Sequence, residues 1–359
     1  MKKVKLTLKD VALKLGVSTA TISNAFNRPD QLSVARREEI LAACKKIGYH
    51  GPNKAAQILR KGHSNIVALI LADNIDYVVS DPVASQFIKG VSRVLQENHK
   101  HLLLYSGDAN SILDVADFVD GFICYGAPRN SYLAEELKQQ SKPVVTVDFN
   151  IGRCPAINID NEEAAYQLAK ATLVEGDRVA ILGLRLINSP TTCRIYDSPL
   201  FDVETSVTLR RLTGYRRALD ELNIPIENEW IWHIPENGGT FSRQAAREVL
   251  SCHPRPTTVL CMSDIIALEL MQCASEMGIS APQDIKITGF DGIDEAKRSR
   301  PPLTTVSQSS VAKGVAAAQA LLSQNAVSRT LGFELYSGGT GIDAALVLDG
   351  PTALGNVAS

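Results

Sequence analysis

From residue 64 onward the sequence alternates between short apolar runs, typical of buried strands, and stretches with the spacing of amphipathic helices. The apolar run Ile66–Leu71, for example, precedes a stretch in which Phe87, Val91 and Leu95 fall on one helical face. Further strand-like runs occupy residues 102–105, 121–124, 144–147, 179–182, 258–261 and 285–288. Repeated strand–helix units predict parallel sheets covered by helices on both faces. The runs form two series, which predict two lobes with a ligand cleft at the carboxyl ends of the strands.

The first 62 residues differ from this α/β region in charge. They contain 13 Lys or Arg and four acidic residues, a net charge of +9. The remaining 297 residues carry 24 basic and 35 acidic groups, a net charge of −11. A basic end on an acidic body is typical of a protein that binds nucleic acid through one end. A chance basic face is the alternative that charge alone leaves open.

Three short helices are predicted in the basic segment. Thr7 begins a capping-box pattern at the start of the first helix. Ser18 caps a second helix over 19–26, and Ser33 caps a third over 34–47. The first two helices are joined so tightly that they predict a helix-turn-helix.

The second predicted helix exposes short polar or small side chains, which suit a DNA groove. In a helix-turn-helix, the N-terminal part of the second helix meets the base edges. The pattern alone also fits a plain three-helix bundle, because any such bundle has capped helices and polar outer faces.

Several motifs of the chain occur together in the order and spacing of one family. The basic segment resembles the opening of the lac repressor (LacI/GalR) family in the motifs Thr7-Leu-Lys-Asp-Val-Ala, Gly16-Val-Ser, Thr21-Ile-Ser, Asn27, Ile47-Gly-Tyr, Pro52-Asn and Leu59-Arg-Lys-Gly62. The remainder resembles the family's core domain in the motifs Ile159-Asp-Asn, Arg211-Leu-Thr-Gly-Tyr, Ser263-Asp, Gly278-Ile, Pro282-Gln-Asp-Ile, Gly289-Phe-Asp and Pro302-Leu-Thr-Thr.

The resemblance spans nearly the whole chain and implies its architecture. We expect a small all-α helix-turn-helix head and an α/β two-lobe core resembling type I periplasmic binding proteins, with parallel sheets and helices on both faces. The expected divisions are a DNA-binding domain at 1–50, a hinge helix and linker at 51–63, and a core for effector binding and dimerisation at 64–359. Within the core, lobe one takes about 64–160 and 309–335, and lobe two takes about 161–308 and 336–359.

The hinge helix, over 52–61, has a specific role implied by the resemblance. In the family this helix orders on the operator and a leucine, matched here by Leu59, wedges into the minor groove and kinks the DNA. The alternative is that Ile58 and Leu59 only pack on the larger domain. Motif and resemblance together give as candidate DNA contacts Thr7, Ser18, Thr19, Ala20, Thr21, Ser23, Asn24, Asn27, Ser33, Asn53, Ala56 and Leu59.

The resemblance also implies four effector-binding residues. Arg211 and Asp264 match family positions that hydrogen-bond the effector, and Asp148 and Phe241 match further pocket positions. A carboxylate can take hydrogen bonds from sugar hydroxyls, Arg fixes acceptors, and Phe241 could stack on an apolar ring face. For Asp264 a helix N-cap before Ile266 is the other interpretation, and for Arg211 a surface charge.

The connection between Gly183 and Gly214 is longer than the family's usual one and carries three arginines. Connections of this length are usually functional or disordered. A lid whose Arg185, Arg194 and Arg210 favour an acidic sugar is our hypothesis for it. The glycine-rich tail 338–341 is weak evidence for a phosphate site, because no P-loop accompanies it.

Other features exclude whole classes of function. The seven cysteines are scattered and odd in number, which predicts reduced buried residues and neither a disulfide framework nor a metal site. The six histidines show no catalytic spacing and no nucleophile elbow occurs, so we expect neither an enzyme nor a cofactor. No apolar run is long enough for a membrane span, and no signal peptide follows the start, which predicts a cytoplasmic protein.

The sequence therefore predicts a transcriptional regulator. We expect a homodimer that binds a pseudo-palindromic, double-stranded operator, acts as a repressor and responds to a sugar or sugar derivative. A transport-type sugar-binding protein shares the two-lobe core but would need a signal peptide and no basic head. The sequence does not decide whether the protein represses or activates transcription, or whether the effector is an inducer or a corepressor.

Overall fold

The computed structural model describes residues 6–51, 62–202 and 206–341. The N-terminal head and the α/β core fall in two compact units, which we describe separately. The hinge helix predicted over 52–61, with its candidate contacts Asn53, Ala56 and Leu59, lies outside the described residues.

The head is a three-helix domain with a one-turn 3₁₀ helix that the sequence did not predict. Its elements are α1 (Leu8–Leu15), α2 (Thr19–Asn27), η1 (Pro29–Gln31) and α3 (Val34–Lys46). The apolar faces of these helices form one small core, built from Val11, Ala12, Ile22, Ala25, Ile40, Cys44 and Tyr49. Phe26 meets the Tyr49 ring edge-on at 5.7 Å. The predicted helix-turn-helix is therefore confirmed.

The predicted helix starts are also confirmed, since each cap binds a backbone amide that its helix leaves free. Thr7 and Asp10 form the full capping box on α1. The Ser18 hydroxyl accepts from the Thr21 N–H at 3.0 Å, and the Ser33 hydroxyl accepts from the Arg36 N–H at 3.4 Å.

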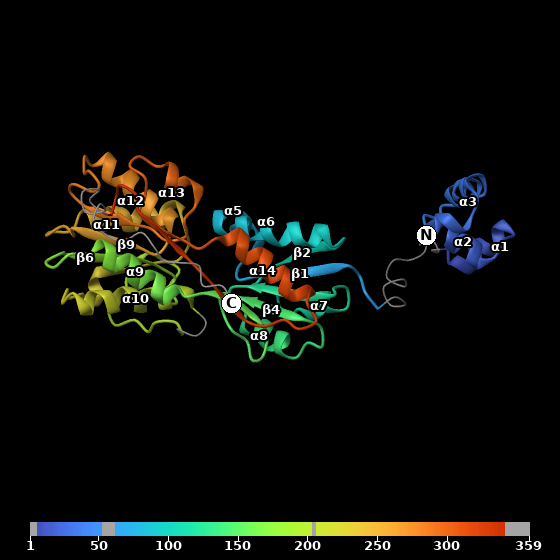
Figure 1. Ribbon diagram of the computed structural model, residues 1–359, viewed down its shortest axis with the longest axis horizontal. Helices are drawn as coiled ribbons and strands as arrows, with labels where there is room; N and C mark the ends of the chain where they lie inside the picture. The colour runs from blue at the N-terminus through green and yellow to red at the C-terminus, as the bar shows by residue number, and fades with distance from the viewer. Residues whose placement is uncertain (1–5, 52–61, 203–205, 342–359) are drawn as a thin grey trace. The chain divides into compact units, whose positions relative to one another are not determined.

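Lobe one of the core is a six-stranded parallel sheet in the order β12-β5-β4-β3-β1-β2. Its strands are β1 (Ile66–Leu71), β2 (His101–Tyr105), β3 (Gly121–Tyr125), β4 (Val144–Val147), β5 (Ala156–Ile159) and β12 (Arg329–Leu331). Its helices are α5 (Ile75–Ser80), α6 (Pro82–Glu97), α7 (Leu113–Ala116), α8 (Ser131–Lys138) and α14 (Ser310–Leu322). Figure 1 shows α14, late in the chain, lying beside α6.

Lobe two is a five-stranded sheet in the order β10-β9-β6-β8-β7, parallel except for the short edge strand β7. Its strands are β6 (Val179–Leu184), β7 (Cys193–Arg194), β8 (Ile231–Ile234), β9 (Thr258–Cys261) and β10 (Lys286–Thr288). Its helices are α9 (Asn161–Thr172), α10 (Val207–Glu221), η2 (Asn228–Trp230), α11 (Gly239–Leu250), α12 (Asp264–Glu276) and α13 (Asp294–Arg298).

In each lobe, a glycine allows two neighbouring helices to pack closely against each other. A Cβ on Gly314 of α14 would lie 2.2 Å from the Phe87 carbonyl of α6, and one on Gly214 of α10 would lie 2.1 Å from the Glu162 carbonyl of α9. Any larger residue would push the helices apart, so these positions set the spacing of α14 on α6 and of α10 on α9.

The chain crosses between the sheets more than once. It leaves lobe one after β5, and after β11 (Thr305–Ser307) it returns to lobe one through α14. After β12 it pairs β13 (Glu334–Tyr336) with β11 in an antiparallel ribbon. The fold class is as predicted, although the sequence pattern missed β5, β7, β8, β12 and the β11–β13 ribbon.

The glycine-rich tail is packed rather than open. Thr340 is fully buried, and its hydroxyl donates to the Ile287 carbonyl at 2.7 Å. A Cβ on Gly338 would meet the Leu303 backbone at 2.4 Å. The glycines therefore allow the tail to run close to the 302–304 backbone, which accounts for them without a phosphate.

Candidate functional site

The first candidate surface is α2 of the head. The first turn of α2 lies at the surface of the head. Thr19, Ala20 and Asn27 are exposed, and Thr21, Ser23 and Asn24 are half-buried. The inner face of α2 is occupied by Ile22 and Ala25, which are fully buried. The polar residues that the sequence singled out therefore share the outward side of α2.

Three of the predicted DNA contacts are helix caps. Thr7, Ser18 and Ser33 are exposed, and each is the N-cap of one helix. Helix N-termini attract phosphate, because free N–H groups and the helix dipole both favour an anion. Six basic residues around the caps and helix ends are exposed and can contact the DNA backbone: Lys9, Lys14, Arg28, Arg36, Lys45 and Lys46.

The second candidate site is a cavity of about 890 Å³ between the two lobes. The residues that line it from lobe one follow β1, β3 and β4 and include Asp73, Arg129 and Asp148. From lobe two they follow β6, β8 and β10 and include Arg185, Asn237 and Asp291. The cavity thus lies at the carboxyl ends of the parallel strands, where the sequence predicted it.

A chain of buried polar contacts forms one wall of this cavity. Lys313 of α14 is almost completely buried and lies 2.6 Å from Asp148 Oδ2 and 2.7 Å from Gln308 Oε1. The Gln308 amide donates to Asp291 Oδ1 at 2.6 Å, and Arg211 Nη2 lies 3.3 Å from the same oxygen. This series of contacts therefore links lobe one to lobe two, and four of its members line the cavity: Asp148, Gln308, Asp291 and Arg211.

Arg211 is fixed by contacts on every side. Its Nε donates to Asn161 Oδ1 at 3.0 Å, its Nη1 to the Met262 carbonyl at 2.6 Å, and its guanidinium stacks 3.6 Å from the Phe290 ring centre. Burial raises the pKa of Asp291, and the neighbouring Arg211 charge opposes that rise. The pair presents a charged, rigid group to a ligand and excludes the surface-charge interpretation of Arg211.

Two buried polar atoms of the cavity lack partners. Asp148 Oδ1 and Arg185 Nη2 have no hydrogen-bond partner among the described residues. A buried polar group without a partner is unfavourable, so a ligand that offers a donor to the first and an acceptor to the second would stabilise both. Hydroxyl groups can do either.

Three of the four predicted effector residues line the cavity: Asp148, Arg211 and Phe241. Asp264 does not, which corrects the expectation of a direct contact. It is fully buried, its Oδ2 accepts from the Ile293 N–H at 2.9 Å, and its Oδ1 accepts from the Thr305 hydroxyl at 2.5 Å. Nor is it the N-cap of α12, because Ser263 occupies that position.

Sequence reasoning missed three members of the polar wall: Asp291, Gln308 and Lys313. Asp291 ends the Gly289-Phe-Asp motif and could have been selected from it. Lys313 is the one cation in α14, a helix of otherwise mostly small and apolar residues. A lone lysine in such a helix indicates a buried charge with a specific partner. Gln308 carried none, because only the fold brings its side chain between two charges.

In the described part of the long connection after β6, the three arginines already have partners, so they do not form a lid of free charges. Arg185 lines the cavity but is paired with Asp73. Arg194 lies over the Trp232 ring at 4.7 Å, and Arg210 donates to the Asp148 carbonyl at 2.6 Å.

His233 orders the start of this connection. Its Nδ1 accepts from the Leu186 N–H at 3.1 Å and its Nε2 lies 3.0 Å from the Ser189 carbonyl. Burial lowers the pKa of His233, which favours the neutral ring that these contacts require.

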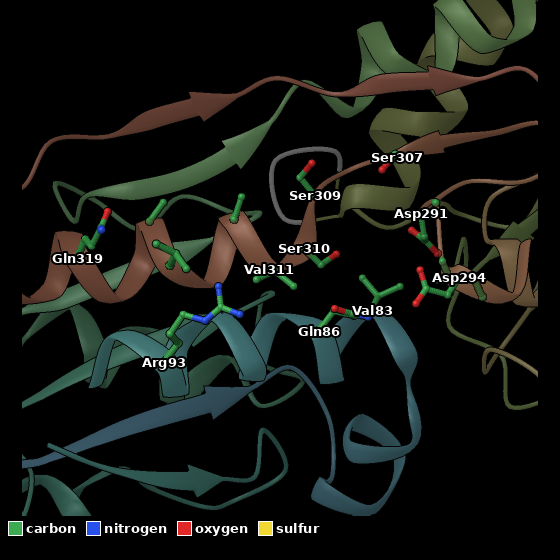
Figure 2. A pocket seen from close by; sticks show the side chains of 15 residues that line it. Val83, Gln86, Arg93, Asp291, Asp294, Ser307, Ser309, Ser310, Val311 and Gln319 are labelled. Atoms are coloured by element: carbon green, nitrogen blue, oxygen red, sulfur yellow. The ribbon is translucent and has the colours of Figure 1, made fainter. Parts of the chain in front are cut away.

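A second, smaller hollow of about 600 Å³ lies between α6 and α14. Figure 2 shows Gln86 and Arg93 of α6 facing Ser310 and Gln319 of α14, with Asp291 at one end. Asp291 lines both hollows, so they meet at this carboxylate. The larger cavity has the more convergent polar groups and is the better candidate for a small molecule.

Two further searches bear on function. Among residues 6–51, 62–202 and 206–341, no group of three or more metal-ligand side chains is found. In the same part of the chain, no helix combines the length and apolar character that a membrane crossing requires.

Comparison with known proteins gives matches to both parts of the chain. The model described as "Bacterial regulatory proteins, lacI family" matches residues 7–53, and the one described as "Periplasmic binding protein-like domain" matches residues 196–330. The HTH-type transcriptional regulator Rv3575c of Mycobacterium tuberculosis is 36% identical over 333 residues, 88% of this chain and 90% of that protein.

Two solved structures share the fold. The transcriptional regulator CelR in complex with cellobiose has a TM-score of 0.65 and 23% identity, and the match covers 94% of this chain and 100% of that one. The lac repressor dimer bound to operator and an anti-inducer has a TM-score of 0.69 and 21% identity, over 95% and 100%.

Proposed function

Because the chain belongs to the LacI family of bacterial regulatory proteins, and is a DNA-binding transcriptional regulator with a periplasmic-binding-protein-like effector domain, we propose that it is a sugar-responsive repressor. In this proposal it binds a pseudo-palindromic operator as a homodimer in the cytoplasm. The observation that carries the proposal is one chain with both an exposed polar helix-turn-helix surface and a polar inter-lobe cavity.

The DNA contacts remain as the sequence predicted them. Thr19, Ala20 and Asn24 on α2 would meet base edges, and the caps Thr7, Ser18 and Ser33 would position the head on phosphates. Asn53, Ala56 and Leu59 are proposed to act from the hinge.

A homodimer is proposed from the family to which the chain belongs, and β2 is an edge strand of the lobe-one sheet. The lac repressor in the operator-bound structure is itself a dimer.

The cavity favours a neutral polyhydroxylated effector over an acidic one. Among the described residues its lining holds five carboxylates (Asp73, Asp81, Asp148, Glu236 and Asp291) and three arginines (Arg129, Arg185 and Arg211). Each of these arginines already contacts a carboxylate, so their charge is largely balanced and attracts an anionic ligand less than free arginines would. An acidic sugar is the alternative that the titration below distinguishes.

DNA binding is tested with the purified full chain and a pool of genomic DNA fragments at two salt concentrations. The proposal expects a short palindrome to be enriched at the higher salt. Asn24→Ala should lose affinity for that site by roughly five- to 150-fold, as expected for about 1–3 kcal/mol per base contact. The matched control Asn325→Ala, an exposed asparagine of the core, should not. Retention that vanishes with salt and enriches nothing would leave only charge-driven binding.

Effector binding is tested by calorimetric titration with D-ribose, cellobiose and D-glucuronate. Binding of a neutral sugar that Asp148→Asn weakens, and that the exposed control Asp108→Asn does not, supports the assignment. Preferential binding of D-glucuronate would instead support the acidic alternative. Binding that Asp148→Asn leaves unchanged would refute the role of this carboxylate.

A further inference from the structure

One carboxylate at the cavity is shared by an arginine from each lobe. Asp73 follows β1 in lobe one and is only 4% exposed. Its Oδ1 lies 2.5 Å from Nε of Arg129, which follows β3 in the same lobe. Its Oδ2 accepts from Nη1 of Arg185, which follows β6 in lobe two. The Asp73–Arg185 pair therefore joins the lobes directly.

Arg185 is anchored in lobe two although its charge lies against lobe one. Its backbone N–H donates to the Ile234 carbonyl at 2.9 Å, and its Nε donates to the Pro235 carbonyl at 2.9 Å. Its guanidinium carbon is 5.2 Å from the ring centre of Tyr77 in α5. Because the side chain is held at its base, movement of lobe two away from lobe one must break the contacts at its tip.

A second pair of contacts reinforces the first. Asn237 follows β8 in lobe two, and Ser263 holds its Oδ1 at 2.7 Å. The backbone N–H of Asn237 donates to the Tyr77 hydroxyl at 3.1 Å, and Nδ2 of Asn237 donates to Asp81 Oδ2 at 3.4 Å. Lobe two thus reaches the segment that contains α5 through two separate side chains.

We propose that the Asp73–Arg185 pair, together with the Tyr77–Asn237 contact, is a latch that holds the two lobes closed over the cavity. All four residues line the cavity, so a bound molecule that engages them changes the strength of the latch. The latch sets the balance between open and closed lobes before any effector arrives. This inference concerns regulation of the cavity and rests on the proposed function only for the cavity's role as the effector site.

Weakening the latch should shift the equilibrium between closed and open lobes toward the open state. A hydrogen bond between charged groups typically contributes enough free energy to change an equilibrium roughly tenfold or more. Arg185→Gln removes the charge of lobe two that pairs with Asp73 of lobe one. Asp73 keeps its ion pair with Arg129, so it is not left as an unpaired buried carboxylate. Arg129→Gln is the matched control, since it removes an arginine from the same carboxylate without touching the inter-lobe pair.

The test is hydrogen exchange of the full chain, followed in backbone peptides of the cavity wall around Asp148 and residues 206–211. No latch residue lies in these peptides, and the Thr208 hydroxyl donates to the backbone carbonyl of Arg185, which Arg185→Gln leaves in place. Arg210 of the second peptide binds the Asp148 carbonyl of the first across the lobes, so separation of the lobes exposes both segments to solvent. We expect exchange there to rise roughly tenfold in Arg185→Gln and to stay at the wild-type rate in Arg129→Gln. The radius of gyration from solution scattering should rise in the first variant only.

Equal exchange in both variants would overturn the latch, as would a rise confined to residues 73–81 and 234–238. Tyr77→Phe, which removes only a neutral hydroxyl, provides a second variant if Arg185→Gln does not fold, and it should give a smaller rise in the same peptides. An unchanged rate in Tyr77→Phe would then count against the latch. Neither measurement uses DNA or sugar, so a chain that bound no operator would still test the latch.

Discussion

The buried ion pair between Lys313 and Asp148 gives the sharpest test of how the core is held together. Both side chains are nearly inaccessible, with 1% and 9% exposure, and the charged atoms are 2.6 Å apart. Lys313→Met would remove the cation and leave Asp148 Oδ2 and the side-chain amide oxygen of Gln308 without this donor. Loss of one partner of a buried pair typically costs about 3–5 kcal/mol, because the remaining charge is desolvated and uncompensated.

The chain contains a control with the same chemistry at the surface. Lys138 and Glu135 are also 2.6 Å apart, but they are 44% and 61% exposed. An exposed pair contributes about 0–1 kcal/mol, so Lys138→Met should lower the free energy of unfolding by less than about 1 kcal/mol. Burial is the main difference between the two pairs.

The assay is urea unfolding of the full chain at neutral pH, followed by far-UV circular dichroism. The double variant Asp148→Asn/Lys313→Met removes both charges, and replacing a whole buried pair is often neutral or even stabilising. We expect it to recover most of the stability lost in Lys313→Met. If Lys313→Met were no worse than Lys138→Met, the reasoning would fail. If the double variant stayed as unstable as Lys313→Met, lost packing and not unpaired charge would be the cause.

Three further predictions follow from single sites. Gly314→Ala places a Cβ 2.2 Å from the Phe87 carbonyl, and calorimetric melting should show a loss of about 1–3 kcal/mol or more from overpacking; an unchanged melting temperature would contradict the close contact of α14 with α6. Ser18→Ala removes the α2 cap and should lower the stability of the head by about 1 kcal/mol, measured by amide exchange of α2, whereas Ser18→Gly should lose only a few tenths. Burial raises the pKa of Asp264 from 3.8 to about 6. Between these pH values the unfolded chain has released the proton that the folded chain keeps, so this group's contribution to the unfolding free energy falls as pH rises. Relative to Asp264→Asn, urea titrations should show wild type losing roughly 2 kcal/mol from pH 4 to pH 6.5, and a flat difference would show that the pKa is ordinary.

The sequence determined the parts of this protein that depend on local periodicity and on turn chemistry. The caps Thr7, Ser18 and Ser33 could be recognised because each accepts a hydrogen bond from the amide three residues further on, and all three were confirmed. The strands Ile66–Leu71 and Val144–Val147 were predicted to the residue because the first is continuously apolar and the second is apolar except for Thr146, as is typical of strands buried on both faces. Strand β8 was missed although it is entirely buried, since the run Ile-Trp-His-Ile contains a histidine whose partners lie in another segment.

Only the tertiary structure decided what each polar residue of the cavity does. Asp264 and Asp291 are both aspartates in recognisable motifs, yet Asp264 is buried among its own hydrogen-bond partners and Asp291 lines the cavity. Arg185, Arg194 and Arg210 are alike in the sequence, but their partners are a carboxylate of the opposite lobe, a tryptophan ring and a backbone carbonyl. These partners are 38 or more positions away along the chain. The strength of a charged contact depends on distance and burial, and neither quantity is written in the spacing of residues along a chain.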